Sequence, residues 1–375
     1  MQPAALMGSS LADWISAISQ LIFLVIFILL FVGANQRLQV YVWKGDIKSK
    51  LGVIEWLATG ARKRAREYIA KNKGRDVDRL LERTIDFFLI EPVSVEPTDI
   101  IKRMDHLFNV RRLRFKDFFK QAMSEADDVT RSRAEVAVEV ASALNYIYKI
   151  VRHLLMYGEK TKNWILIMQL QLVMPMILQQ ARTLWKAQEH FLKGVPIGDG
   201  AGPLVAVRLA GEGAEWREVD DETVASEVDL EGRRLIIVKA KGPASSVGRP
   251  GRATERIVRD LVGKGVKPAL LLTVDAALKL EGEETGSIAE GVGAAIGDPG
   301  PEKIRFERIA AEYDIPLRAL AIKMSEEEAI TAMNEKIYKA IDKAVERAKT
   351  IILQETRPGD TVILVGVGNT AGIAQ

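Results

Sequence analysis

The most apolar stretch of the chain lies near its beginning. Residues 14–36 carry no charged side chain, and residues 21–32 form an unbroken run of strongly apolar side chains. A helix needs about 20 predominantly apolar residues to cross the hydrocarbon core of a bilayer. The pattern therefore predicts an N-terminal transmembrane anchor within residues 1–36. A cleaved signal peptide is disfavoured, because Asp13 is the only charged side chain ahead of the apolar core and that core is too long.

Basic residues follow the predicted anchor in excess. Residues 37–75 hold eleven Lys and Arg residues against three acidic ones. Cytoplasmic flanks of membrane helices carry such an excess. We therefore expect a single-pass protein of the cell membrane, with the N-terminus outside and the bulk of the chain in the cytoplasm.

Helical spacing of apolar residues continues through residues 37–193, which we interpret as a cytoplasmic helical domain. A helix is expected over residues 37–75, and helices and turns alternate over residues 76–115. A long helix over residues 116–157, ended by Gly158, is followed by a second over residues 161–193. Together these two predict a long helical hairpin in an α-helical middle region.

One segment of the second hairpin helix is nearly apolar on every side. Residues 163–181 carry no charge but include four glutamines and Pro175. Burial in a core or in an oligomer interface is favoured over a second membrane helix or an in-plane membrane helix, because polar side chains in hydrocarbon need partners. Such a helix must be buried by something, so we expect a homo-oligomer.

The pattern changes after a Gly- and Pro-rich segment at residues 194–203. We interpret this segment as a linker. The less favoured alternative is that it has a functional role, because its tight backbone holds the carboxylate of Asp199. Apolar runs of strand length then alternate with helical stretches, which predicts an α/β domain over residues 204–375 with a mainly parallel sheet. The expected strands are 204–209, 234–239, 269–275, 318–324 and 361–366. The expected helices are 251–262, 284–295, 301–313 and 325–356.

Composition narrows the chemistry. The chain has 53 basic and 50 acidic residues, a formal net charge of +3, and no cysteine. The absence of cysteine excludes disulfides, thiolate metal sites and a Cys nucleophile. The basic excess adjoins the predicted membrane helix, so attraction to the lipid bilayer is a simpler interpretation than specific nucleic-acid binding.

Glycine-rich loops leave the carboxyl ends of the predicted strands, where open parallel sheets bind ligands. The loop after residues 234–239 has the features of an anion site: glycines, cations and a following helix N-terminus. Its candidate anion-binding residues are Lys241, Gly248, Arg249, Gly251 and Arg252. A second loop, after residues 361–366, adds Gly366, Gly368 and Asn369. Each loop alone is also what any α/β protein needs at its turns, and neither matches a known phosphate-binding fingerprint.

Carboxylates supply the other candidates, which are Asp275, Glu281, Glu283, Glu284 and Asp298. Asp275 ends a strand of buried-type residues, a position from which Mg²⁺ is often held near phosphates. Asp275 and Glu281 are the candidate catalytic acid/base residues, and Asp275 is the candidate metal ligand. Glu283 and Glu284 are better explained as residues that favour a helix N-terminus. Ser245 and Ser246 lack a nearby His, which disfavours a serine triad.

Several motifs together resemble an archaeal family of membrane proteins known as domain of unknown function 1512. They are PIGDG at 196–200, GPLVA at 202–206, VGRPG at 247–251, TVDAALKLEG at 273–282 and GVGNT at 366–370. The resemblance covers most of the chain, anchor included. It implies an archaeal membrane protein and supplies no activity.

Three functions fit these features. The first is a membrane-anchored homo-oligomer whose cytoplasmic α/β domain binds a nucleotide or another phosphate-bearing ligand, with Mg²⁺ as a candidate cofactor. The second is a non-enzymatic membrane scaffold that assembles through its helical hairpin. The third is a factor for membrane-protein biogenesis that uses the hairpin on nascent helices. The sequence leaves open whether the protein is an enzyme.

Overall fold

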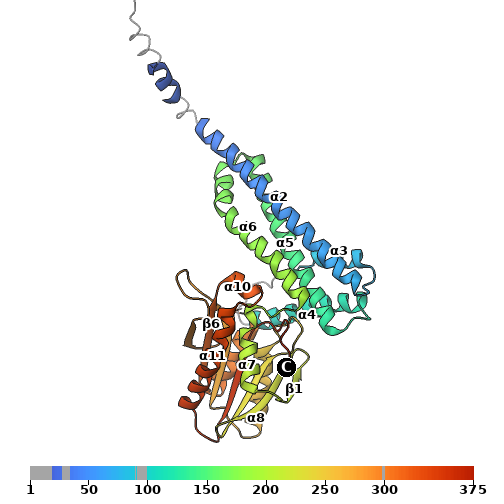
Figure 1. Cartoon of the computed structure of the whole chain (residues 1–375), viewed down its shortest axis with the longest axis vertical. Coiled ribbons are helices and arrows are strands. Elements are labelled where there is room, and N and C mark those ends of the chain that lie inside the picture. Colours follow the sequence, from blue (N-terminus) through green and yellow to red (C-terminus); the bar gives the residue numbers. More distant parts are fainter. Residues whose placement is uncertain (1–18, 28–33, 89, 91–98, 298–299) are drawn as a thin grey trace, which may run out of the picture. The chain divides into compact units, whose positions relative to one another are not determined.

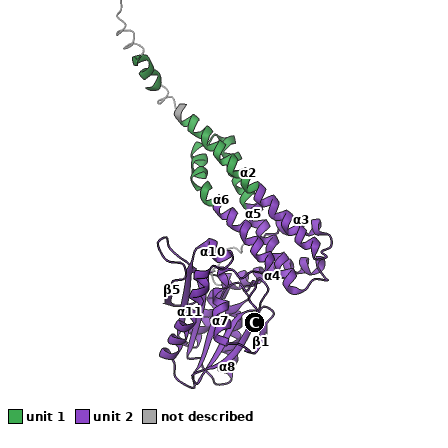
Figure 2. Ribbon diagram, viewed as in Figure 1, with its two compact units in different colours: residues 1–55, 147–178 green, residues 56–146, 179–375 purple. Residues whose placement is uncertain are grey.

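The structure is a computed structural model of the chain, which describes residues 19–27, 34–88, 90, 99–297 and 300–375. It divides into two compact units (Figure 2). Unit 1 contains the residues up to 55 together with residues 147–178. Unit 2 contains residues 56–146 and 179–375.

The first half of the chain is helical. Its elements are α2 (Ala34–Lys71), α3 (Val77–Ile85), α4 (Ile100–Ala122), α5 (Asp128–Thr161) and α6 (Trp164–Lys193). The expected hairpin is present as α5 and α6. The expected single helix over residues 116–157 is wrong, because α4 ends and α5 begins inside it, and Gly158 lies within α5 rather than after it.

The helices of unit 2 enclose a core of their own. Buried side chains of α2, α3, α4 and α5 meet around Phe119, Leu81 and Ile69. Gln188 of α6 is fully buried, and its side-chain amide donates hydrogen bonds to the carbonyl oxygens of Ala61 (3.0 Å) and Ala137 (2.8 Å). A buried amide needs such partners to avoid a desolvation penalty, so Gln188 fixes α6 against α2 and α5.

The second half forms the predicted α/β domain, coloured from light green to red in Figure 1. It begins with the short 3-10 helix η1 (Gly198–Gly200) and α7 (Ala201–Ala210). The strands are β1 (Trp216–Asp220), β2 (Thr223–Leu230), β3 (Arg233–Ala240), β4 (Leu270–Leu278), β5 (Ile288–Val292), β6 (Leu317–Met324) and β7 (Thr361–Gly366). The remaining helices are α8 (Pro250–Gly263), α9 (Pro301–Glu312), α10 (Glu326–Ile330) and α11 (Glu335–Glu355).

The sheet is mixed, which corrects the expectation of a mainly parallel one. Its strand order is β1-β2-β3-β7-β4-β6-β5. The four central strands β3, β7, β4 and β6 are parallel to one another, whereas β1 and β2 on one side and β5 on the other add in antiparallel orientation. The parallel centre is buried on both faces, as its continuous apolar runs require.

Two hydrophobic clusters cover the two faces of the sheet. Side chains of α7 and α11 pack with Leu272, Val274 and Leu320 on one face. Side chains of α8 and α9 pack with Leu271, Ile363 and Val365 on the other. Alternate residues of β4 therefore point to opposite layers, as strand geometry dictates.

Further predictions of local structure are wrong. Residues 204–209 are part of α7, since a short apolar run does not by itself distinguish a strand from a buried helix. Residues 284–295 were expected to be helical but contain β5; Gly286, Gly291 and Gly293 are poor helix formers. The expected helix over residues 325–356 is split into α10 and α11.

The predicted membrane anchor lies partly outside the described residues, since 14–18 and 28–33 are not described. Residues 19–27 are helical, and their large apolar side chains are exposed, with Phe23 at 71%. Among the described residues, one helix, α6, is long and apolar enough to cross a membrane. Core helices of soluble proteins share that length and composition.

Candidate functional site

The first carboxylate of the candidate site is Asp199, in η1. Its oxygen Oδ2 accepts a 2.8 Å hydrogen bond from the backbone N–H of Asn369, just beyond β7. The backbone of η1 is tied to the rest of the domain, because the N–H of Gly198 donates to the carbonyl oxygen of Thr331 (3.2 Å). Asp199 is therefore held at the carboxyl edge of the central strands.

The second carboxylate is Asp275, near the end of β4. Asp275 is only 4% exposed. Its Oδ1 accepts a 2.7 Å hydrogen bond from the backbone N–H of Ala276, and its Oδ2 accepts one of 3.1 Å from Gly297. The segment after β5 thus returns to this carboxyl group. The sequence-based candidate Asp275 is a buried, oriented side chain at a strand end.

Asp199 and Asp275 line one pocket of about 610 Å³. The other described lining residues are mostly small and apolar, with Glu290 as the exception and no Lys, Arg or His among them. They are Ala276, Ala277, Leu278, Ala289, Glu290, Gly291, Ala294, Ala295, Ile296, Gly297, Ala319, Ala321, Met324 and Ala329. The pocket therefore presents two carboxyl groups without an ion-pair partner among the described residues, beside Glu290, which pairs with Arg347. The rest of the lining is mainly apolar, a common form for a ligand site.

Electrostatics couple the two carboxyl groups. Burial raises the pKa of Asp275 well above its ordinary value, and the negative charge of Asp199 raises it further. Burial also raises the pKa of Asp199, which the hydrogen bond from Asn369 partly offsets. No described residue forms an ion pair with either group. Both shifts favour the protonated form of the carboxyl group, and the shift is larger for Asp275 than for Asp199.

Glycines allow the chain segments of this site to approach closely. A Cβ atom at Gly368 would lie 1.9 Å from the carbonyl oxygen of Asp199, and Gly368 has a φ of +134°. A Cβ atom at Gly202 would lie 2.1 Å from the carbonyl oxygen of Val367, and one at Gly366 would lie 2.4 Å from that of Gly202. The glycines that suggested an anion loop after β7 thus serve the contact between η1, α7 and β7.

We expect Asp199→Asn to stabilise the folded protein at neutral pH. The amide side chain of this variant keeps an oxygen for the N–H of Asn369, and the substitution removes a carboxyl group that folding makes harder to ionise. The pKa of the Asp199 carboxyl group is higher in the folded protein than in the unfolded chain, where it is about 3.9. Such a group stabilises the folded protein below the pKa of the unfolded chain, and this stability is lost as the pH rises through the pKa of the folded protein. The gain should therefore appear as pH rises and be absent near pH 3.

The measurement is thermal unfolding of the full chain in detergent across this pH range. Asp260→Asn, on the exposed surface of α8, is the matched control. Its carboxylate pairs with Lys264, which lowers its pKa, so its loss should bring no gain at high pH. Equal Tm differences for both variants at every pH would contradict the expectation.

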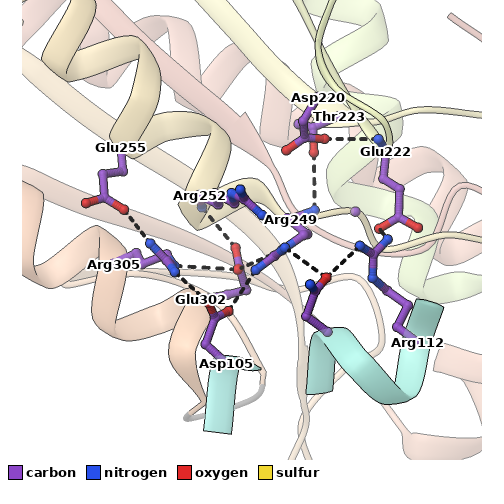
Figure 3. Close-up of polar contacts among 12 residues, drawn as sticks. Asp105, Arg112, Asp220, Glu222, Thr223, Arg249, Arg252, Glu255, Glu302 and Arg305 are labelled. Carbon is purple, nitrogen blue, oxygen red and sulfur yellow. Dashed lines mark hydrogen bonds and ion pairs between the residues drawn. The ribbon is translucent and has the colours of Figure 1, made fainter. Parts of the chain in front are cut away.

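The cationic loop between β3 and α8 is occupied by the protein's own carboxylates (Figure 3). Glu302 of α9 sits at the N-terminus of α8, where its Oε2 accepts a 3.0 Å hydrogen bond from the backbone N–H of Arg252. A carboxylate is favoured at this end of a helix. Gly251 lies against α9, because a Cβ atom at Gly251 would be 2.3 Å from the carbonyl oxygen of Glu302.

Arg249 is part of an ion-pair cluster with α4. Its Nη2 lies 2.7 Å from Oδ1 of Asp105, and Arg305 reaches the other oxygen of Asp105 at 2.9 Å. Arg305 also pairs with Glu255 at 2.5 Å. Figure 3 shows Asp105 pointing from α4 toward both guanidinium groups. These contacts connect the helical part of unit 2 to its α/β domain.

The other sequence-based candidates lie apart from the pocket. Lys241 pairs with Glu218, and Gly248 adopts a left-handed φ of +64°. Glu281 is exposed in the turn after β4, and Glu283 pairs with Lys323. Asp298 lies outside the described residues. The structure thus brings Asp275, Gly366, Gly368 and Asn369 to the site around Asp199, and it leaves Lys241, Gly248, Arg249, Gly251, Arg252 and Glu281 elsewhere.

A third carboxyl group with a raised pKa, that of the half-buried Glu135, was not singled out from the sequence. A cavity of about 690 Å³ is lined by α4, α5 and the loop after β3, and Glu135 of α5 lies in it. Burial raises the pKa of Glu135 to about 7. A glutamate among other charges at helical spacing is typical of a solvated face, so nothing in the local pattern indicates its burial.

Comparison with known proteins yields a family. A model of the C-terminal domain of the proteins described as domain of unknown function 1512 matches residues 197–374. A model of the N-terminal domain of the same proteins matches residues 21–194. No curated protein matches the sequence. Since the two matches cover nearly the whole chain in the right order, the chain belongs to the family described as domain of unknown function 1512.

Proposed function

We propose that the α/β domain is a hydrolase in which Asp199 and Asp275 act as an acid–base pair on a carbonyl bond, with a peptide or other amide as the substrate class. One observation carries this proposal: two partly or fully buried carboxyl groups without a counter-cation among the described residues line a single, otherwise mainly apolar pocket. Burying such groups is unfavourable. Perturbed carboxyl pairs of this kind are typical of acid–base sites.

The environment gives the two carboxyl groups different roles. Both the burial of Asp275 and the charge of Asp199 raise the pKa of Asp275, so Asp275 keeps the shared proton and Asp199 is ionised. Asp199 is then the general base, and Asp275 is the general acid. The hydrogen bond from Asn369 to Asp199 stabilises the ionised form.

The proposed reaction conserves atoms and protons. Asp199 removes a proton from a water molecule as the water oxygen bonds to the carbonyl carbon, and Asp275 donates its proton to the carbonyl oxygen. In the second step the proton on Asp199 passes to the amide nitrogen, the C–N bond breaks, and Asp275 recovers its proton from the hydroxyl. The products are a carboxylic acid and an amine, and the pair again holds one proton.

A phosphate-bearing ligand with Mg²⁺ is the second candidate, and the two carboxylates favour it as well. Mg²⁺ is commonly held by one or two carboxylates together with waters and substrate phosphates. The pocket has no described Lys or Arg in its lining to receive a phosphate, which is why hydrolysis by proton transfer is preferred. Thermal-shift measurements with Mg²⁺ and nucleotides separate the two, because only the second candidate predicts stabilisation by them.

We also propose that residues 14–36 anchor the protein in the cell membrane, with the N-terminus outside and residues 37–375 in the cytoplasm. The exposed apolar side chains of residues 19–27 support this. Self-association through the uncharged part of α6 is supported by its exposed Leu172 and Met176. A full-length chain recovered in the soluble fraction without detergent would contradict the anchor.

The hydrolase proposal is tested with the purified full-length protein in detergent and a broad mixture of peptides. Incubation in ¹⁸O-labelled water should place one ¹⁸O atom in each new carboxyl terminus, detected by mass spectrometry. The variant Asp199→Asn should lose this incorporation, and Asp260→Asn should retain it. Equal incorporation by the protein and Asp199→Asn would contradict the assignment of the base.

A further inference from the structure

A second feature of the protein lies at the end of unit 1 where α2 begins and the α5–α6 hairpin turns. The first turns of α2 and the hairpin turn line a common cavity of about 430 Å³, which includes Tyr41, Gly158 and Trp164. Ion pairs join the same segments, since Lys44 and Lys48 lie 3.4 Å and 2.9 Å from the carboxylate of Glu159. These segments therefore form one surface.

Large apolar and aromatic side chains are exposed on this surface. We call them the tip surface. They are Leu38, Tyr41, Val42, Met156, Tyr157, Trp164 and Ile165, each between 41% and 73% exposed. Tyr41 and Trp164 line the common cavity, and the others lie within a few residues of it along the same helices. A concentration of exposed apolar groups marks an interaction site rather than ordinary surface. Trp and Tyr with aliphatic neighbours are typical of the membrane–water interface.

Positive charge is in excess in the two segments that carry the tip surface. Residues 37–50 and 149–165 hold eight basic residues and only two acidic ones, Asp46 and Glu159. The basic residues are Arg37, Lys44, Lys48, Lys50, Lys149, Arg152, Lys160 and Lys162. Both acidic residues are already paired with lysines, whereas Arg37, Lys160 and Lys162 form no ion pair with any described residue. The charge that would complement this surface is negative.

The position of the tip surface along the chain fits a lipid bilayer. The proposed anchor ends at Gln36, and Tyr41 follows five residues later in the same helix α2. At 1.5 Å per residue this is a rise of about 7 Å, which is close to the thickness of one headgroup layer, about 5–7 Å. A second copy of the protein would bring two positively charged surfaces together, which electrostatics oppose.

We propose that the tip surface docks on the anionic headgroup layer of the membrane in which the chain is anchored, with Tyr157, Trp164 and Ile165 entering the interface. This inference rests on the proposed anchor and is independent of the proposed hydrolase. Amphipathic segments of this kind bury their apolar side chains about 5–10 Å into the headgroup–acyl boundary. The hairpin then holds unit 1 at the membrane by a second contact that does not span it.

The absence of cysteine permits a direct test with single-cysteine variants of the full-length protein. A nitroxide spin label is attached at Ile165→Cys, at Val25→Cys in the anchor, and at Val292→Cys, which is 83% exposed on β5. The proteins are placed in vesicles of phosphatidylcholine and phosphatidylglycerol. Collision of the label with oxygen, which enters lipid, is compared with collision with a nickel chelate, which stays in water.

The expected result is that labels at residues 25 and 165 are shielded from the nickel chelate, on the order of tenfold relative to residue 292, since the interface buries them. Replacing Lys160 and Lys162 with Glu should weaken the shielding at 165 but not at 25. Vesicles of neutral lipid should also weaken the shielding at 165, because each basic residue near an anionic surface strengthens binding by about fivefold.

Four results would overturn the proposal. A label at 165 as open to the nickel chelate as that at 292, with 25 still shielded, removes the docking and leaves the anchor. A label at 25 that is open to the chelate removes the anchor itself. Spin–spin broadening at 165 that disappears on dilution with unlabelled protein assigns the surface to a second copy. A label at Leu172 as deep as that at 25 would instead indicate a second membrane span.

Discussion

Asp275→Asn should lower the rate of hydrolysis by about 10²–10⁴-fold, the range by which a positioned general acid contributes to catalysis. The substitution keeps the size of the side chain, and its single acceptor oxygen can serve one of the two backbone N–H groups, those of Ala276 and Gly297, that now bond to separate carboxyl oxygens. It removes the proton that the scheme transfers to the carbonyl oxygen. The effect should appear in kcat, because the acid acts in the transition state.

The pH dependence provides a sharper check than the loss of activity alone. Below the pKa of Asp199 both carboxyl groups are protonated and the base is lost; above the pKa of Asp275 both are ionised and the acid is lost. The rate should therefore follow a bell-shaped curve. On the alkaline side, the rate should fall only at a pH well above the ordinary pKa of a carboxyl group, because burial and the charge of Asp199 raise the pKa of Asp275.

Controls separate this result from loss of folding. Asp260→Asn should leave the curve unchanged, and circular dichroism should show a cooperative unfolding transition for all variants. If Asp275→Asn keeps the rate and the pH curve of the unaltered protein, Asp275 is not the acid. If instead Mg²⁺ is needed for turnover and a chelator abolishes it, the second candidate function replaces the first.

Much of this architecture follows from local sequence patterns. The parallel strands β3, β4, β6 and β7 are apolar runs of strand length separated by helical stretches, and that alternation is enough to predict them. Strands β1 and β2 were missed because they lie at one side of the sheet, where charged residues such as Glu218 and Glu227 face solvent. The two strands form an antiparallel pair in which β1 is partly exposed along its whole length and only the first half of β2 is buried.

Only part of the candidate site, like only part of the fold, could be predicted from local sequence. Asp275 stands at the end of a buried strand, and position alone made it a candidate. Asp199 sits in a segment whose glycines indicate a linker, and its role depends on contact with Asn369, which is 170 residues away. Arg249 in the loop after β3 looked free because its partners Asp105 and Glu302 come from distant helices. Long-range pairing of this kind leaves no local signal.

The burial of the two carboxyl groups depends energetically on the close packing that the neighbouring glycines allow. Folding has to hold two carboxyl groups in a mainly apolar pocket without a cation to pair with them, which is unfavourable. Tight backbone packing of η1 and α7 on the ends of β4 and β7 compensates for it. A site that is unfavourable in itself persists only where the surrounding structure over-determines it.

Gly202→Ala should therefore destabilise the α/β domain by about 3 kcal/mol or more, the upper part of the range for overpacking a core. An added Cβ atom would lie 2.1 Å from the carbonyl oxygen of Val367 and 2.4 Å from that of Val274. Both are backbone atoms at the ends of the sheet strands, so no side chain can rotate away. Thermal unfolding should show a Tm lowered by about 6–12 °C for a domain of this size.

Gly263→Ala is the matched control for this substitution. Gly263 is the last residue of α8, and a Cβ atom there would meet no atom within 4 Å. Alanine is the better helix former by up to about 1 kcal/mol, so this variant should be as stable as the unaltered protein or slightly more so. If Gly202→Ala behaves like Gly263→Ala, then α7 does not rest on the strand ends, and Asp199 has no fixed position beside Asp275. If Gly202→Ala unfolds early while Gly263→Ala does not, the close approach that brings the two carboxyl groups together is a requirement of the fold.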